Sequence, residues 1–466
     1  MNRTDRFLRS AFVALAVGLG WGIRGDFGHL IGAMYPGAAL GLAFCYVSGQ
    51  KSLFRWMPFL AAISAVGIGT GGHMSYGILH GYAQADTFIN YAYGFLTLFL
   101  QGAAWGVFGC AAVGLLLEEP RVKPGEWVGA MLTILFAGAA VYTLVVVLLG
   151  FHINPPRSDA SIGFTGGAIG LFLWLALNKK RLGLRAATLG YVGFGIGMSG
   201  GRLLGNIANV GTTLSFGGLG PFSINHWNVM EVSVGLIGGF VFAWGMLGLK
   251  YPDPPEGENQ SLLSIYGALY VLAGIPLLHR LTRVELPKKF DEWTEALRRY
   301  GYQDPEGLAR GTMTVLSVVC VVGFIGALIW LYLHFKGKHR WAWFPVLWLS
   351  VVMLLYQNVN ALYFLYPRQP NQINMHFVFW ILLGLMAAYV IRQGIKGGPL
   401  PLLDTEEAAS RFRCLRWAAI GLAAYVVIVL MAGFINGDHT MKTANTRWPL
   451  WSWRDGPFPG RQAEPR

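Results

Sequence analysis

Apolar segments long enough to cross a bilayer recur along almost the whole chain. A spanning helix needs about 17 to 25 predominantly apolar residues, and about thirteen windows approach or meet that length. They fall at residues 9–23, 29–48, 56–72, 90–117, 127–150, 162–178, 186–204, 230–249, 261–279, 312–335, 341–366, 375–395 and 417–435. The pattern predicts an all-α polytopic membrane protein with about 13 transmembrane helices.

Glycine-rich stretches interrupt three of these windows or the joints between them. They lie at residues 20–29, 67–73 and 193–202. Because glycine has no Cβ, it lets a helix bend and lets backbones approach closely, so we expect glycine-broken helices at these places. The alternative is that the glycines serve only close packing between helices and bind no ligand.

The spacing of the glycines also predicts an internal repeat. A shift of 129 residues places Gly37 over Gly166 and keeps pairing glycines across four windows. Residues 1–120 and 125–250 are therefore expected to be two four-span repeats, and an even number of spans makes the repeats parallel. A third copy within residues 261–435 rests on a shorter match and is kept as an alternative.

The C-terminal membrane region, residues 261–435, contains a longer polar insert at residues 280–311, and a polar, Trp-rich tail follows at 436–466. Within the insert Phe290, Trp293 and Leu297 recur at helical spacing, as in an amphipathic helix. We expect a helix that lies at the membrane interface or covers a site, with a solvated connector as the alternative.

Composition supports the membrane interpretation. Hydrophobic residues make up 54% of the chain and charged residues 13%, and the mean hydropathy is +0.47, which soluble globular chains seldom show. The net charge of +13 could indicate nucleic-acid binding, but the basic residues form short clusters between apolar segments. The expected partners are therefore the lipid bilayer and a small polar solute, and no nucleic acid.

The distribution of Lys and Arg predicts a topology. Basic clusters such as Arg3–Arg9, Lys51–Arg55 and Lys179–Arg181 alternate with segments that carry few cations. The positive-inside rule then places the N-terminus in the cytoplasm of a multi-pass protein of the cell (plasma or inner) membrane. The insert at 280–311 departs from this pattern, because it carries seven Lys and Arg residues on the expected outer side.

Ionisable residues next to the first window are the leading candidates for a site. Arg24, Asp26 and His29 lie where the flanking sequence is apolar, and charges at membrane depth normally pair and face a protein interior or cavity. Arg24 and Asp26 are the nearest partners for each other along the chain. The alternative is an open loop in which they meet lipid headgroups and water.

Further polar residues extend this candidate site. His73 and Arg202 end two of the glycine-rich stretches, and amide-rich clusters begin the eighth window and end the eleventh. Amides with an aromatic face suit a neutral polyhydroxy ligand, whereas capping and interhelical hydrogen bonds are the structural alternative. The expected substrate-binding residues are Arg24, Asp26, His29, His73, Arg202, Asn225, His226, Trp227, Asn228, Glu231, Gln357, Asn358 and Asn360.

No catalytic signature accompanies these residues. The sequence contains no P-loop, no HExxH and no nucleophile elbow in a suitable setting, and its glycine pattern lacks the strand and helix of a dinucleotide site. The four cysteines are far apart, so no metal site is expected. We therefore expect no cofactor, and an enzyme is the less favoured class.

The function expected from the sequence is secondary transport of a small polar, sugar-like solute. Asp26, Glu231 or a histidine would be available for proton coupling, as in a symporter. One alternative is a membrane-embedded transferase-type enzyme that uses a histidine as its base. Another is a scaffold subunit of a membrane complex, suggested by the 17 tryptophans.

Overall fold

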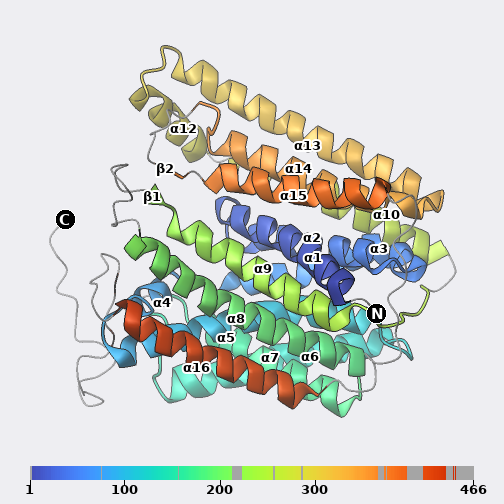
Figure 1. Ribbon diagram of the computed structural model, residues 1–466, viewed down its shortest axis with the longest axis vertical. Coiled ribbons are helices and arrows are strands. Elements are labelled where there is room, and N and C mark those ends of the chain that lie inside the picture. Colours follow the sequence, from blue (N-terminus) through green and yellow to red (C-terminus); the bar gives the residue numbers. More distant parts are fainter. Residues whose placement is uncertain are drawn as a thin grey trace.

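Long helices lying side by side make up the structure, a computed structural model (Figure 1). It describes residues 3–74, 76–155, 157–211, 223–254, 258–284, 287–365, 372–373, 375–395, 413–436, 444 and 447. Within these residues twelve helices are long and apolar enough to cross a membrane. The predicted class of all-α polytopic membrane protein is confirmed at this level.

The helices follow the predicted windows closely. The first group is α1 (Arg3–Arg24), the 3₁₀ turn η1 (Gly25–Phe27), α2 (Leu30–Ser48), α3 (Lys51–Thr70), the 3₁₀ turn η2 (Gly71–His73), α4 (Gly77–Tyr82) and α5 (Phe88–Leu116). The second group is α6 (Pro124–Tyr142), the π-helical turn η3 (Thr143–Leu148), α7 (Ala160–Leu177), α8 (Arg181–Gly211) and α9 (His226–Met246).

The remaining elements belong to the C-terminal region. They are α10 (Glu258–Leu269), the π-helical turn η4 (Tyr270–Gly274), α11 (Ile275–His279), the π-helical turn η5 (Arg280–Val284), α12 (Pro287–Arg299), α13 (Pro305–Phe335), the 3₁₀ turn η6 (His339–Trp341), α14 (Trp343–Asn360), α15 (Met375–Ile395) and α16 (Cys414–Asn436). A two-residue parallel pairing joins β1 (Ser223–Ile224) to β2 (Gln372–Ile373).

The count of twelve differs from the predicted thirteen only at α8. This helix has 31 residues and packs along α5, α9 and α16. Its glycines and arginines lower its hydropathy, so it is not among the twelve. Length and packing therefore mark α8 as part of the same bundle, although its composition is less apolar.

Apolar side chains face outward as well as inward. On α6, Met131, Leu135 and Phe136 are exposed, and on α16 Leu415 and Phe434 are exposed. Such a surface in water would be an aggregation hazard, whereas lipid is a suitable solvent for it. The central helices α2 and α5 are instead almost wholly covered by their neighbours.

Close approach between backbones holds the centre together. A Cβ placed on Gly37 of α2 would lie 2.6 Å from the carbonyl oxygen of Ser64 in α3. A Cβ on Gly235 of α9 would meet the carbonyl of Val17 in α1. These contacts fit the packing alternative for the small residues, since only glycine allows the helices to come this close.

Two of the three predicted helix breaks are present. The helix α1 ends at Arg24, and after η1 the chain turns at Gly28, whose φ of 76° favours glycine. The helix α3 ends at Thr70 and is followed by η2 and the short α4. Both breaks leave the chain near the same end of the bundle as β1 (Figure 1).

The predicted break at residues 193–202 is wrong, because α8 runs through this stretch without interruption. Its glycines have a different role. A Cβ on Gly197 would lie 2.8 Å from the Val234 carbonyl oxygen, and one on Gly201 would lie 2.7 Å from that of Met230. The glycine pattern here therefore serves the α8–α9 contact and does not interrupt the helix.

The four-span repeats at residues 1–120 and 125–250, and the third copy, stay predictions. In the first segment α2 packs along most of α3, whereas its expected counterpart α7 touches only a small part of α8. The two segments thus differ in packing at this pair of helices.

The insert at residues 280–311 contains the amphipathic helix that its spacing predicted. Trp293 and Leu297 of α12 are buried, and the Trp293 indole Nε1 donates to the Asn360 carbonyl at 2.9 Å. The Tyr302 hydroxyl donates to the Leu365 carbonyl at 2.6 Å. One face of the insert therefore covers the C-terminal end of α14.

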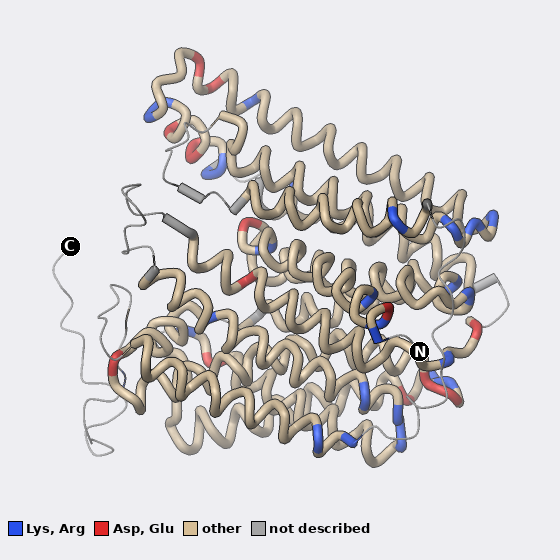
Figure 2. Tube along the Cα trace, viewed as in Figure 1, with Lys and Arg blue, Asp and Glu red and all other residues tan. Residues whose placement is uncertain are grey.

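Charged residues gather at the ends of the helices. Figure 2 shows Lys and Arg concentrated toward the end of the bundle where the N-terminus lies, with few along the middle of the helices. The cytoplasmic orientation of that end stays a prediction. Most of the predicted tail at 436–466 lies outside the described residues.

Candidate functional site

Arg24 lies buried at the C-terminal end of α1 and is paired with residues far away in the sequence. It is 1% exposed, and its Nη2 lies 2.7 Å from Oε1 of Glu231 in α9. The same nitrogen donates to the Tyr76 hydroxyl. The guanidinium carbon lies 5.3 Å from the centre of the Tyr76 ring and 5.4 Å from that of Trp105, so aromatic faces also stabilise the cation. We call Arg24, Tyr76, Trp105 and Glu231 the Arg24 cluster.

Local structure favours these charges. A cation at the C-terminus of a helix and a carboxylate near the N-terminus of another both interact favourably with helix dipoles. Arg24 ends α1, and Glu231 lies early in α9. The Tyr76 hydroxyl completes the cluster by donating to Glu231 Oε1 at 3.4 Å. Burial raises the pKa of Tyr76 to about 12, so the hydroxyl keeps its proton.

The prediction that Arg24 pairs with Asp26 is wrong. Asp26 lies on the turn η1 and is exposed. Its carboxylate accepts from the Gln357 amide, and its backbone carbonyl lies 3.3 Å from Nε2 of His279. Because α1 ends at Arg24, the turn carries the Asp26 side chain away from the guanidinium, and Glu231 takes the place of the counterion.

Two further predicted residues border this cluster. His29 Nδ1 lies 3.3 Å from Arg24 Nη1, and its ring packs edge-on against Tyr76. Gln357 is buried and lies 3.4 Å from His376 Nε2, as well as contacting Asp26. The structure therefore brings together Arg24, Glu231 and His29, and places the Asp26–Gln357 pair beside them at the start of α2.

Arg202 forms a second buried cation, in α8. It is 0% exposed, and its Nε donates to Oδ1 of Asn206 at 2.7 Å. The Asn206 amide in turn donates to the Ala83 carbonyl at 3.0 Å and to Oδ1 of Asn436 at 3.1 Å. Neither Nη1 nor Nη2 of Arg202 has a hydrogen-bond partner in the described part of the chain.

His80, for which the sequence carries no local signal of a site, lies beside this cation. It is 1% exposed, and neither ring nitrogen has a hydrogen-bond partner within the described residues. Its ring packs 4.6 Å from that of Trp227 and 5.2 Å from that of Tyr76. Burial, and next the charge of Arg202, hold the pKa of His80 well below its usual value, so His80 is neutral at pH 7.

His226 and Trp227 complete this second group. Their rings lie 5.8 Å apart, and Nε2 of His226 has no hydrogen-bond partner among the described residues. A Cβ on Gly205 would lie 2.9 Å from the His226 carbonyl oxygen and 3.6 Å from Cζ of Arg202, which places the start of α9 against this part of α8. The Arg202 cluster is defined by its members: Arg202, Asn206, His80, His226 and Trp227.

Most of the predicted amides serve the structural alternatives. Asn225 caps α9 by accepting from the Trp227 backbone N–H at 3.0 Å, and the Asn228 amide donates to the Gly22 carbonyl at 3.1 Å. The Asn358 amide donates to the Leu354 carbonyl at 2.7 Å. These contacts are capping and interhelical or intrahelical hydrogen bonds. Fewer amide groups therefore remain for the sugar-like ligand that the sequence predicted.

Two predicted residues lie elsewhere. Asn360 is buried at the end of α14, under α12, and its side-chain oxygen has no hydrogen-bond partner in the described part of the chain. The side chain of His73 lies outside the described residues.

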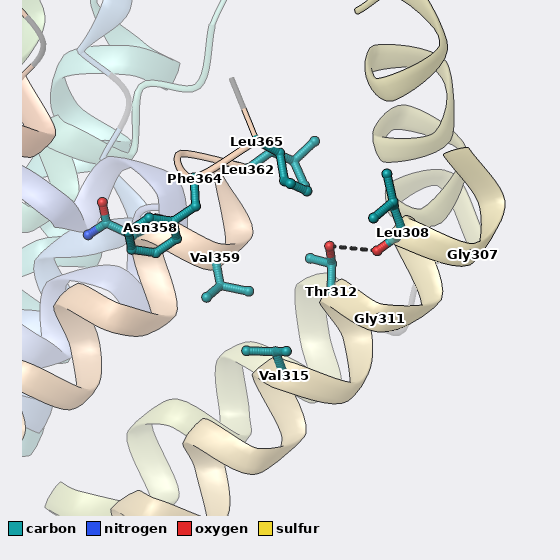
Figure 3. Close-up of a pocket in the computed structure, with 10 residues that line it drawn as sticks. All are labelled: Gly307, Leu308, Gly311, Thr312, Val315, Asn358, Val359, Leu362, Phe364 and Leu365. Atoms are coloured by element: carbon teal, nitrogen blue, oxygen red, sulfur yellow. Dashed lines mark hydrogen bonds between the residues drawn. The ribbon is translucent and has the colours of Figure 1, made fainter. Parts of the chain in front are cut away.

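A cavity of about 300 Å³ lies between the start of α13 and the end of α14 (Figure 3). Its lining is Gly307, Leu308, Gly311, Thr312, Val315, Asn358, Val359, Leu362, Phe364 and Leu365. The Thr312 hydroxyl donates to the Leu308 carbonyl at 2.9 Å, so it is not available to a ligand as a donor. The cavity is apolar, and Asn358 is the one predicted site residue that borders it, so it suits an acyl chain better than a polar solute.

Comparison with known proteins adds no relative. No protein-family model matches the chain, and neither a curated protein nor a solved structure does so.

Proposed function

We propose that this protein is a secondary transporter of a small polar solute. The observation that carries the proposal is the Arg24 cluster, a buried ion pair located where α1 is interrupted before α2. Discontinuous helices with buried charges are a recurrent design of transporter sites, because freed backbone groups and ionised side chains can hold a solute or ion. The neighbouring pair adds two polar groups at the same helix break, the exposed carboxylate of Asp26 and the buried amide of Gln357.

Proton coupling is part of the proposal, with Glu231 as its carrier. A buried carboxylate held by one guanidinium and one hydroxyl is stable when ionised only while both partners stay in place. A conformational change that moves α1 relative to α9 would separate Glu231 from Arg24 and favour protonation of the carboxylate. This provides a physical link between the access state of the site and the binding of a proton.

The sugar-like substrate loses support, because Asn225, Asn228 and Asn358 are engaged with the protein itself. The proposal therefore keeps a small polar solute as the substrate. The cell membrane and the cytoplasmic N-terminus belong to the same proposal, on the strength of the Lys and Arg distribution.

Uptake into proteoliposomes tests this function. The purified protein would be reconstituted and given an acidic exterior, together with a panel of radiolabelled neutral sugars, carboxylic acids and cations. We expect uptake of at least one class that collapses with a protonophore. Glu231→Gln should uncouple uptake from the proton gradient, whereas Asn225→Ala, a change at an exposed helix cap, should keep the coupling.

A folded, monodisperse protein that takes up none of these classes would contradict the proposal. The transferase-type enzyme and the scaffold subunit would then be the functions to examine, the first by incubation with lipid-linked donors and the second by purification from native membranes.

A further inference from the structure

We propose that Arg202, together with His80 and His226, binds the oxyanion group of an acidic ligand, a carboxylate or a phosphate. This inference rests on the proposed function only where it takes the ligand to be the transported solute. The binding site itself is inferred from the geometry of the Arg202 cluster.

The first step is the unmet hydrogen-bonding capacity of Arg202. A guanidinium has five N–H donors and no acceptor, and its charge is costly to bury without a partner. In Arg202 the Nε donor is satisfied by Asn206, while the Nη1 and Nη2 groups have no partner in the described part of the chain. Two adjacent donor groups of this kind form the fork that binds a carboxylate or phosphate in bidentate fashion.

The second step is the lack of a counterion for Arg202. Among the described residues no Asp or Glu forms an ion pair with Arg202, and its one hydrogen bond goes to the neutral amide of Asn206. Glu231 itself is held by Arg24 at 2.7 Å. A positive charge left in this environment favours an anion from outside the protein.

The third step is the support that holds the fork. Asn206 accepts from Arg202 and is itself fixed to the Ala83 carbonyl and to Asn436 of α16. The Asn436 amide donates to the carbonyls of Ala83 and Ala85 at 2.9 and 3.0 Å. Three parts of the chain therefore hold Arg202 in one orientation, as a preorganised binding site requires.

The fourth step is the complementary donors beside the cation. A neutral imidazole carries one N–H, and His80 has both ring nitrogens without a partner among the described residues. Nε2 of His226 is in the same state. The Trp227 ring packs on the rings of both histidines and supplies an apolar surface beside them. Polar donors beside an aromatic surface are typical of sites for small organic acids.

Thermal unfolding of the purified full chain in detergent tests the site directly. The probes are succinate, inorganic phosphate and the neutral analogue succinamide. A further sample would be placed in nanodiscs with or without phosphatidylglycerol, to separate a soluble anion from a lipid headgroup as the source of the oxyanion. We expect an anion to raise the midpoint of unfolding and succinamide to leave it unchanged.

Arg202→Met is the decisive variant, with Arg185→Met as its matched control. Arg185 is also buried in α8, but its guanidinium donates to the Gly245 carbonyl through Nε at 3.0 Å and Nη2 at 2.6 Å. We expect Arg202→Met to weaken anion binding by at least about tenfold, a loss of one charge-assisted contact. Arg185→Met should unfold earlier yet keep the anion-induced shift.

His80→Phe keeps the test decisive if Arg202→Met does not fold. It preserves the aromatic contacts of the ring and removes its donors, so anion binding should weaken by several-fold. An equal shift from succinamide, an unchanged anion shift in both Arg202→Met and His80→Phe, or no shift with succinate, phosphate or phosphatidylglycerol would overturn the proposal. A shift that depends on Arg202 with phosphatidylglycerol alone would assign the site to a lipid headgroup.

These experiments distinguish failure of the anion-binding site from failure of the proposed transport function. Binding of succinate that requires Arg202, in a protein without uptake, would contradict transport and support the site. Uptake of a neutral solute by a protein that no anion stabilises would support transport and contradict the site.

Discussion

Two buried arginines on the same side of the bundle differ in how their charge is compensated. Arg24 is held by a carboxylate, a hydroxyl and two aromatic faces, whereas the outer guanidinium nitrogens of Arg202 have no partner within the described residues. Both side chains are almost fully buried. The protein provides the counterion for the first and leaves the second to a ligand.

The difference also separates stability from function. A buried ion pair contributes little net stability, but removing one of its partners is very costly. A buried charge without a partner lowers the stability of the protein for as long as no ligand is bound to it. A cost of this kind is typical of binding sites, because the ligand provides what the folded protein lacks. Substitutions should therefore have opposite effects on stability in the two clusters.

The largest effect is expected at the Arg24 cluster. Glu231→Gln removes the counterion of a buried guanidinium and should lower the free energy of unfolding by about 3 to 5 kcal/mol. Asp26→Asn, at an exposed residue that does not contact Arg24, should change it by about 0 to 1 kcal/mol. Thermal and denaturant unfolding in detergent would measure both. A larger loss for Asp26→Asn than for Glu231→Gln would mean that Asp26, and not Glu231, compensates Arg24.

The second effect has the opposite sign. Arg202→Met replaces an uncompensated buried cation by an apolar chain of similar length and should raise the free energy of unfolding, without ligand, by about 1 to 4 kcal/mol. Arg24→Met should lower it, because Glu231 is left buried and unpaired. Differential scanning calorimetry of both variants under identical conditions would show whether the two changes have opposite signs. A loss of stability in Arg202→Met would remove the contrast between the two arginines.

A smaller effect is expected from acidification at His80. The ring faces Arg202, His226 and Arg24, all cations or potential cations, and Tyr76 packs on it. Its pKa is lower in the folded than in the unfolded protein, so the stability it contributes is present above about pH 6.5 and is lost as the pH falls below that value. The loss should approach about 1.4 kcal/mol per pH unit for one proton.

His80→Phe checks this prediction, since it removes the proton-binding group and retains the ring. The variant should unfold with a shallower dependence on pH between about 4 and about 6.5, the range in which a histidine of lowered pKa gains its proton. Succinate should reduce the wild-type loss on acidification, because an anion beside His80 favours the protonated ring. Parallel pH profiles for the variant and the wild type would count against a neutral, buried His80.

The smallest effect concerns access and leaves stability unchanged. Arg24 and Arg202 both lie toward the helix ends that are opposite the N-terminus of α1, the side on which residue 158 precedes α7. In a chain whose native cysteines are replaced, Ser158→Cys should react with an impermeant maleimide added outside intact cells, whereas Lys51→Cys should react only after permeabilisation; both residues are exposed. The reverse pattern would turn both arginine sites toward the cytoplasm.

The sequence by itself determined the class of protein and most of the elements. Long apolar windows have one stable solution in a bilayer, so the long helices could be located before any contact was known, whereas the short α4 has no such window. The helical spacing of Trp293 and Leu297 predicted α12, and the glycines after Arg24 predicted the break at η1. Arg24 and Arg202 stood out for the same reason, since charge within apolar sequence is costly.

Only the tertiary structure decided which residues meet. Glu231, and not Asp26, is the counterion of Arg24 because of how α9 packs against α1. Arg24 and Asp26 are close in sequence, but α1 ends between them and their side chains separate. His80, Tyr76 and Asn436 carry no local signal for a site, because a lone polar residue in a loop or helix is common. They become parts of a site only when helix packing buries them beside a charge. The energy of this packing comes from long-range contacts, which no single stretch of the chain contains.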